Sequence, residues 1–132
     1  MERLNLSFEN TYEFSYQEML PAASQGFIGI ECISSNKDLI KMLGSISSEK
    51  DMVLAEAERS FVAQLNGSCL SPIAIYCREE SSHVLVSAKA LSQNGDKQIF
   101  KEIISSHASI NEDIRSLAKE FISKGADKLI LS

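Results

Sequence analysis

The feature that most constrains the fold is a change of hydrophobic period at Pro72. Before it, apolar residues recur at helical spacing over about 48–65. After it, apolar and other residues alternate with a period near two in three runs, and Asn94-Gly95 marks a hairpin turn between the last two. The pattern predicts a helix followed by an antiparallel meander of three strands over 73–104.

Polar residues predict where the helices begin and end. Ser48 is expected to cap the first long helix, with Asp51 in the capping-box position. Ser109 and Glu112 predict a full capping box for a second helix, which runs on one apolar stripe to Gly125. Each start signal lies directly before an apolar stripe, so both helices are expected to pack on the sheet.

A helix, three strands and a helix predict an α+β fold, in which helices cover a three-stranded antiparallel sheet. The apolar residues 129–131 are predicted to add a short final strand. The region before residue 47 does not complete this unit. It is expected to contribute a strand and a helix that need other packing partners.

Within that region, Gln25–Cys32 is an apolar run with two glycines, which predicts a short buried strand. A short helix is expected to follow, capped by Asn36 or Ser35 and ended by Gly44. Because the strand would lack neighbours within this chain, residues 1–46 are expected to pack poorly and to exchange their amide hydrogens readily.

Composition narrows the classes of function. A hydrophobic fraction of 44% and a charged fraction of 23% are typical of a globular protein. The formal net charge of -5 argues against nucleic acid as a partner. No apolar run is long enough for a membrane span, and the first residues lack the features of a signal peptide, so a cytoplasmic location is expected.

The chain contains three cysteines, Cys32, Cys69 and Cys77. An odd number without a signal peptide argues against a disulfide framework, and their spacing matches no zinc-site pattern. Cys32 and Cys77 lie in predicted strands and are expected to be packed. His83 and His107 have no partner pattern and are expected at the surface, so no metal site is predicted.

Three segments go beyond periodicity. Residues 19–32, MLPAASQGFIGIEC, resemble the LPAxGQGAxGIE signature of the hydroxymethylbilane synthase (porphobilinogen deaminase) family. Residues 57–59, AER, and 65–73, LNGSCLSPI, resemble the family's AER helix and its LxGGCQVPI loop. The terminal run 125–131 is similar to the family's GAxxIL ending. The segments occur in the family's order and at its spacing, and the resemblance covers essentially the whole chain.

The resemblance implies an activity, a cofactor and a domain layout. The family condenses four porphobilinogen molecules into hydroxymethylbilane on a dipyrromethane cofactor, and Cys69 stands where the family attaches that cofactor through a thioether. A thiolate suits the role because it can add to the electrophilic methylene left when porphobilinogen loses ammonia. Residues 1–46 would then be the tail of domain two and the return segment of domain one. Residues 47–132 would be the cofactor-attachment domain.

Other positions have two interpretations. Gln25 and Gly26 would line the cleft near the bound pyrroles by resemblance, or they simply form a turn into a strand. Glu58 and Arg59 are expected on a solvated helix face or in a structural ion pair.

The sequence also departs from the family pattern. Larger residues stand at positions where the family has small ones. Ser68, for example, replaces the second glycine of the family's cysteine loop. The family's catalytic aspartate and its substrate-binding lysines and arginines precede the matched region, so no catalytic residue is assigned here. A separately encoded N-terminal half is therefore an expected partner, with porphobilinogen as substrate. The alternatives are a non-catalytic α+β binding module and a decayed remnant of the enzyme.

Overall fold

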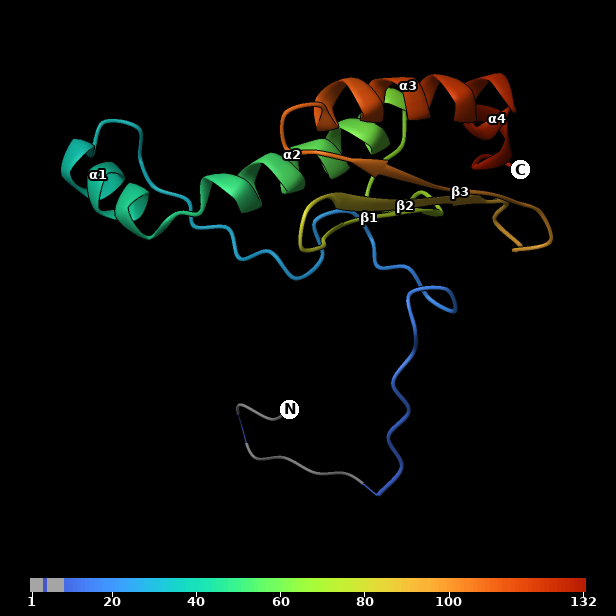
Figure 1. The fold of residues 1–132 in the computed structure, drawn as a ribbon, viewed down its shortest axis with the longest axis horizontal. Helices are drawn as coiled ribbons and strands as arrows, with labels where there is room; N and C mark the ends of the chain where they lie inside the picture. The colour runs from blue at the N-terminus through green and yellow to red at the C-terminus, as the bar shows by residue number, and fades with distance from the viewer. Residues whose placement is uncertain (1–3, 5–8) are drawn as a thin grey trace.

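A three-stranded antiparallel sheet forms the centre of the structure, a computed structural model that describes residues 4 and 9–132 (Figure 1). Its strands are β1 (Ile73–Glu79), β2 (Val84–Leu91) and β3 (Gln98–Ser105), in the spatial order β1-β2-β3. In the register, Ile75 lies opposite Ala88, which lies opposite Lys101. The predicted meander and its hairpin turns are confirmed.

Two long helices, α2 (Glu49–Gln64) and α3 (Ile110–Ser123), cover one face of this sheet (Figure 1). Phe61 of α2 and Phe121 of α3 are fully buried and meet edge to face, with ring centroids 5.1 Å apart. Such aromatic pairs add about 0.5–1.5 kcal/mol to the gain from burial alone. The α+β class predicted from the sequence, with helices covering a three-stranded antiparallel sheet, is therefore confirmed. The side chains of the core come from both helices and from alternate strand positions: Leu54, Phe61, Leu65, Ile73, Ile75, Cys77, Val84, Val86, Ile110, Ile114, Leu117 and Phe121.

The two predicted capping boxes have different outcomes. Ser48 caps α2 as expected, since its hydroxyl accepts a hydrogen bond from the Asp51 N–H at 3.2 Å. Ser109 precedes α3 but forms no side-chain cap. Its backbone is already helical, with φ −104° and ψ −10°, and the Glu112 N–H bonds to the Ser109 carbonyl instead. The Ser109 hydroxyl contacts Ser106, so the prediction of a box there was wrong.

The predicted final strand at 129–131 is also wrong. Gly125 adopts a left-handed conformation with φ +83°, and a short helix, α4 (Ala126–Leu129), follows it. The Gly125 carbonyl accepts hydrogen bonds from the N–H groups of Lys128 and Leu129, which closes a helical turn. Ala126 and Ile130 are buried in the core on one side of that turn. Ala126 and Ile130 are therefore buried because helical spacing puts them on one side, and not because residues alternate along a strand.

The predicted strand at Gln25–Cys32 does not form. Residues 27–33 have no regular structure, and Ile28 is 88% exposed. The segment has no strand beside it among the described residues, so its backbone lacks the ladder that would make it a strand. The sequence pattern indicated a buried strand, but burial requires partners as well as a pattern.

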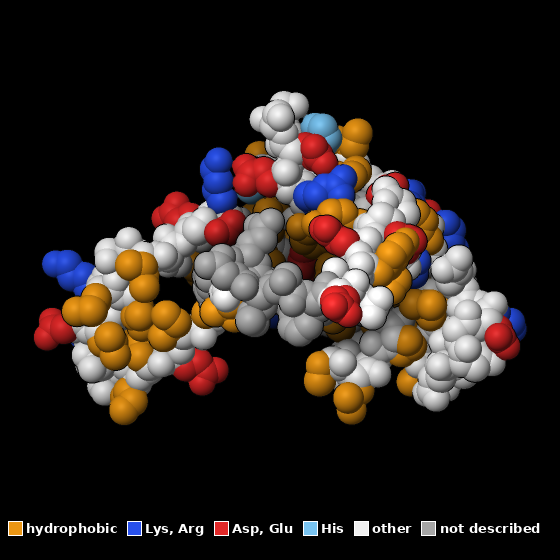
Figure 2. All heavy atoms as spheres, turned by 90° about the horizontal axis from the view of Figure 1, so that it is seen from below, with side chains coloured by type: hydrophobic (Ala, Val, Ile, Leu, Met, Phe, Trp, Pro, Cys, Tyr) orange, Lys and Arg blue, Asp and Glu red, His pale blue; other side chains and the backbone are white. Residues whose placement is uncertain are grey.

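The short helix expected after this segment does form, as α1 (Lys37–Ile46), and the Asn36 side chain caps it by accepting from the Leu39 N–H at 3.1 Å. It continues two residues beyond Gly44, the predicted end. None of its residues is buried, and the helix lies apart from the sheet (Figure 1). Hydrophobic side chains gather on it at the left of Figure 2.

The other face of the sheet is only partly covered. The Tyr16 ring lies 4.8 Å from the Tyr76 ring of β1, and the Arg78 guanidinium lies 5.0 Å from the Tyr16 centroid. Leu20, which follows Tyr16 in the sequence, is buried. Phe100 and Ile104 of β3 remain exposed. No helix among the described residues is long and apolar enough to span a membrane.

Candidate functional site

The Cys69 loop, residues 66–72, connects the end of α2 to the start of β1. Asn66 adopts a left-handed conformation with φ +54°, and the Gly67 N–H bonds to the Val62 carbonyl at 3.0 Å. A Cβ on Gly67 would lie 2.5 Å from Cδ1 of Ile73. A larger residue at position 67 would therefore force the Ile73 side chain to shift and would crowd the Val62 carbonyl, which lies 3.2 Å from the same point.

Two serines hold the remainder of the Cys69 loop. The Ser68 N–H donates to the Ser71 hydroxyl at 2.9 Å, and the Leu70 N–H donates to the Ser68 hydroxyl at 3.2 Å. The Ser71 N–H donates to the Ser68 carbonyl at 3.1 Å. The two hydroxyls thus fix the backbone on both sides of Cys69, and Leu70 is left 92% exposed.

The three thiols occupy different environments. Cys69 is exposed, Cys32 is half-buried and Cys77 is buried at 3% exposure. Burial, together with the charge of Glu58, raises the pKa of the Cys77 thiol to about 12, so it stays protonated and inert at neutral pH. Cys69 is thus the exposed thiol of the three, and Cys77 is packed as expected. The same expectation for Cys32 was wrong, because its segment forms no strand and leaves it half-buried.

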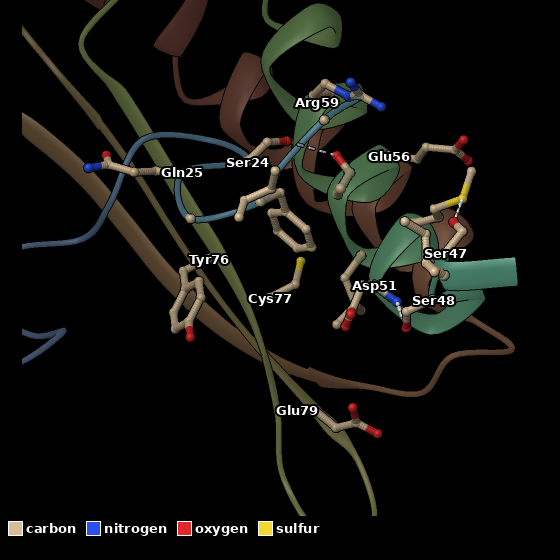
Figure 3. Close-up of a pocket in the computed structure, with 18 residues that line it drawn as sticks. Ser24, Gln25, Ser47, Ser48, Asp51, Glu56, Arg59, Tyr76, Cys77 and Glu79 are labelled. Atoms are coloured by element: carbon tan, nitrogen blue, oxygen red, sulfur yellow. Dashed lines mark hydrogen bonds between the residues drawn. The ribbon is translucent and has the colours of Figure 1, made fainter. Parts of the chain in front are cut away.

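A pocket of about 820 Å³ lies between the turn at residues 24–29, the N-terminal part of α2 and the end of β1 (Figure 3). Gln25 and Gly26 line it, as do Arg59 and Cys77. Cys69 is not among its lining residues, since the Cys69 loop follows the opposite end of α2. The structure therefore brings Gln25 and Gly26 together but does not place them in one pocket with Cys69.

The turn that carries Gln25 and Gly26 is internally bonded. Ser24 and Gly26 both have positive φ, at +60° and +99°. The Gln25 N–H donates to the Ala22 carbonyl at 3.0 Å, and the Phe27 N–H donates to the Ser24 carbonyl at 3.2 Å. The Gln25 side-chain oxygen accepts from the Ala22 N–H at 3.2 Å, so its remaining polar group is the amide –NH₂.

Glu58 is the residue that the sequence interpretation placed wrongly. It was expected on a solvated helix face or in a structural ion pair, yet it is 1% exposed and forms no ion pair with the residues that the structure describes. Its Oε1 accepts from the Cys77 N–H at 2.7 Å and its Oε2 accepts from the Ser24 N–H at 2.6 Å. Burial raises the pKa of this carboxyl, and the two backbone bonds partly oppose that rise. The spacing of Leu54, Glu58, Phe61 and Leu65 was the available signal, because it puts Glu58 on the buried stripe of α2.

The neighbouring charged residues lie near the rim of the pocket. Arg59 is exposed and forms no ion pair with the residues that the structure describes. Lys50 Nζ and His107 Nε2 lie 3.5 and 3.4 Å from Oε1 of Glu79, and they lower the pKa of that carboxyl. His83 and His107 are both half-buried, so each is still partly at the surface, but His107 has an acidic partner, Glu79, that the sequence did not indicate. Across the described range, no cluster of three or more potential metal ligands occurs.

Comparison with known proteins identifies relatives of this chain. The sequence profile of the porphobilinogen deaminase C-terminal domain matches residues 52–123. Porphobilinogen deaminase of Campylobacter jejuni is 35% identical over 132 residues, covering 98% of this chain and 43% of the relative.

Two further relatives are similar. Porphobilinogen deaminase of Campylobacter hominis is 36% identical, covering 98% of this chain and 42% of its own length. That of Listeria monocytogenes is 38% identical over 111 residues, covering 84% of this chain and 35% of its own length. The chain spans less than half the length of these curated relatives, and the matched profile is that of their C-terminal domain. The chain belongs to the porphobilinogen deaminase family and corresponds to the C-terminal part of its members.

Proposed function

We propose that this chain supplies the cofactor-attachment site of a hydroxymethylbilane synthase, with Cys69 as the residue that carries dipyrromethane through a thioether. The enzyme condenses four porphobilinogen molecules into hydroxymethylbilane. The observation that carries the proposal is the exposure of Cys69 within the loop that matches the family's cysteine motif. A permanent tether needs an accessible sulfur on a defined backbone, and the Cys69 loop has both.

The residues around Cys69 fit such a tether. The loop is held by hydrogen bonds of Ser68, Leu70 and Ser71, which use backbone groups and hydroxyls and leave the sulfur free to form a bond. The thiol loses its proton when the thioether forms, and the amino group of porphobilinogen leaves as ammonia. When bound, the cofactor supplies the pyrrole chain to which substrate is added. Ser68 and Ser71 keep the sulfur at the end of α2 and clear of the core.

The domain layout is part of the same proposal. Residues 47–132 form the cofactor-attachment domain, and residues 1–46 belong with the tail of domain two and the return segment of domain one. The exposed apolar side chains of 27–46 support this layout, because such side chains are normally buried against a partner. Gln25 and Gly26 line the pyrrole cleft in this arrangement.

Positive charge for the substrate comes from outside this chain in our proposal. Porphobilinogen and its products carry acetate and propionate groups, which need clustered cations. This chain has a net charge of -5, and Arg78 is already paired with Glu80 at 2.9 Å. An N-terminal half, encoded separately or as part of the same protein, supplies the cationic cleft and the catalytic carboxylate.

The test is intact-mass spectrometry of the purified chain, incubated with porphobilinogen in the presence and absence of the N-terminal half of a Campylobacter relative. We expect a two-pyrrole adduct and tetrapyrrole product only when the N-terminal half is present. Cys69→Ser abolishes the adduct, and Cys32→Ser, the matched control, keeps it. An adduct that persists in Cys69→Ser refutes the attachment site. Product formed by the chain alone refutes the outside source of positive charge.

A second candidate is a non-catalytic binding module. The observation in its favour is the exposed apolar surface of residues 27–46, which would serve a partner without any chemistry at Cys69. An unmodified Cys69 in the presence of a complementing N-terminal half and substrate would favour this candidate.

A further inference from the structure

We propose that Glu58 is a positioning residue, a clasp that holds the Gln25–Gly26 turn at a fixed place relative to the Cys69 loop. The inference deepens the proposed function and rests on it in one respect, namely that a fixed turn matters because it lines the pyrrole cleft. Glu58 does not itself contact Cys69 or any substrate in this account. It acts through the backbone of three chain segments.

The clasp consists of two charge-assisted hydrogen bonds. One carboxylate oxygen of Glu58 accepts from the Ser24 N–H at 2.6 Å, and the other accepts from the Cys77 N–H at 2.7 Å. Charge-assisted bonds of this length are about twice as strong as neutral ones. One side chain of α2 therefore connects β1 to a turn that lies far earlier in the sequence.

The placement of these contacts links the turn to the Cys69 loop. Glu58 lies on α2, which leads into the loop, and Cys77 lies on β1, which leads out of it. From Glu58 to Leu65 the helix spans about 10 Å at 1.5 Å per residue. From Ile73 to Cys77 the strand spans about 13 Å. The turn is thus fixed to both elements that flank Cys69, at a similar distance along each.

Ser24 provides a second attachment at the same place. Its hydroxyl donates to the Ala55 carbonyl of α2 at 3.2 Å (Figure 3). Its backbone has a positive φ of +60°, a conformation that is costly for a residue other than glycine. The bonds from Ser24 to Glu58 and Ala55 hold the backbone in this conformation, which also sets the direction in which Gln25 and Gly26 leave the turn.

The electrostatics of Glu58 are a balance between burial and its two backbone hydrogen bonds. Burial outweighs the two hydrogen bonds and raises the pKa of Glu58, so the ionised carboxylate costs folding free energy. The titratable groups that face it are Tyr76 and Cys77 of β1. A hydrogen bond with Tyr16 is the main cause that raises the pKa of Tyr76, burial is the main cause for Cys77, and the Glu58 charge adds to both. The turn at 22–29 has no titratable side chain. Among the described residues no cation pairs with this carboxylate, and its hydrogen-bond partners are the backbone N–H groups of Ser24 and Cys77.

The experiment measures the distance between nitroxide labels on Cys69 and on Ile28→Cys, by pulsed electron resonance, in the chain with Cys32→Ser. Ile28 is exposed and next to the turn, and buried Cys77 remains unlabelled. We expect one narrow distance distribution, which Glu58→Gln broadens because an amide can accept only one of the two backbone bonds. Glu56→Gln, an exposed neighbour on α2, is the matched control and keeps the narrow distribution.

A narrow distribution that survives in folded Glu58→Gln overturns the clasp, and so does equal broadening in Glu56→Gln. A second measurement needs no substitution at Glu58: we expect the amide protons of Ser24 and Cys77 to shift together with the Glu58 carboxyl in a pH titration followed by NMR. Independent shifts overturn the proposal. If Glu58→Gln does not fold, this NMR titration alone tests the clasp. Neither measurement uses porphobilinogen, so an unloaded Cys69 would refute the proposed function and leave the clasp standing.

Discussion

Residues 48–132 and residues 25–46 both have sequence patterns that predict regular elements, but the structure of residues 9–46 differs from that of 48–132. In the first region, each apolar stripe meets another, and Phe61 and Phe121 are fully buried. In the second, Leu20 is the only buried residue of the segment, and Ile28 and Ile30 are exposed. The comparison shows that a strand pattern yields a strand only where the described chain also supplies a pairing strand, whereas α1 forms without a covering surface because its backbone hydrogen bonds are internal.

The largest expected difference between the two regions is in native-state hydrogen exchange. Amides in the middle of α3 should exchange only through global unfolding, which for a domain of this kind costs about 5–15 kcal/mol. Amides of residues 27–46 should exchange with opening free energies near zero. Mass spectrometry of exchanged peptides measures both in one sample. Equal protection would mean that residues 27–46 have found a partner, such as a second copy of the chain.

The second largest effect is expected from a cavity in the core. Phe121→Ala removes a fully buried ring and should lower the free energy of unfolding by about 3–5 kcal/mol. Ile104→Ala, at a side chain that is 70% exposed on the uncovered sheet face, should change it by less than about 0.5 kcal/mol. Urea denaturation followed by circular dichroism compares the two. Similar losses would show that the uncovered face is packed in solution.

Replacing two glycines, one in each region, should change stability by smaller amounts and in opposite directions. Gly67→Ala places a methyl group 2.5 Å from Ile73 Cδ1 and should destabilise the fold by about 1–3 kcal/mol. Gly44→Ala meets open space in exposed α1 and should favour that helix by up to about 1 kcal/mol. Denaturation reports the first and helical circular dichroism reports the second. A stabilising Gly67→Ala would show that the Cys69 loop can move away from β1.

The smallest effect is expected from the titration of Glu58. Its pKa is raised on folding, so it contributes stability that is fully present below the unfolded pKa and lost as the pH rises through the folded one. Glu79 and Glu120 have lowered pKa values and contribute in the opposite direction, since their stabilisation is lost as the pH falls.

Subtraction isolates Glu58 from the other carboxylates. The unfolding free energy of the unsubstituted chain minus that of Glu58→Gln should decline as the pH increases from about 4.3, the ordinary value for glutamate, through the raised pKa. The same subtraction with exposed Glu56→Gln provides the control and should be nearly flat. A difference that increases with pH would mean that the hydrogen bonds outweigh burial at Glu58.

The elements that sequence reasoning predicted well are those whose signals are local. Alternation in Ile73, Ile75 and Cys77 sufficed for β1, and the turn at Asn94-Gly95 sufficed for the second hairpin. Ser109 shows the limit of such signals, because a suitable side chain cannot cap a helix when its own backbone is already helical. The predicted strand at 129–131 failed because left-handed Gly125 both ends α3 and begins the short helix α4.

At the candidate site, too, the features with local sequence signals were predictable and the others were not. The exposure of Cys69 follows from a loop signal that is visible in the sequence, namely Asn66-Gly67 before it and Pro72 after it. The burial of Glu58 depends on the backbone of Ser24 and Cys77, and no sequence pattern shows that a carboxylate will accept bonds from segments so far apart. The spacing of the apolar residues along α2 was the one sequence signal that Glu58 lies on the buried side of this helix.

The contact between Glu58 and the Cys77 N–H also bears on self-association. β1 is an edge strand, paired only with β2, so its outward N–H groups form a template on which another strand can assemble. The Glu58 carboxylate takes the Cys77 donor and places a buried negative charge against the middle of that edge. A second chain that approached β1 would have to displace this carboxylate and leave it unpaired. The Glu58 side chain thus removes the Cys77 N–H from the donors that this edge offers to another strand.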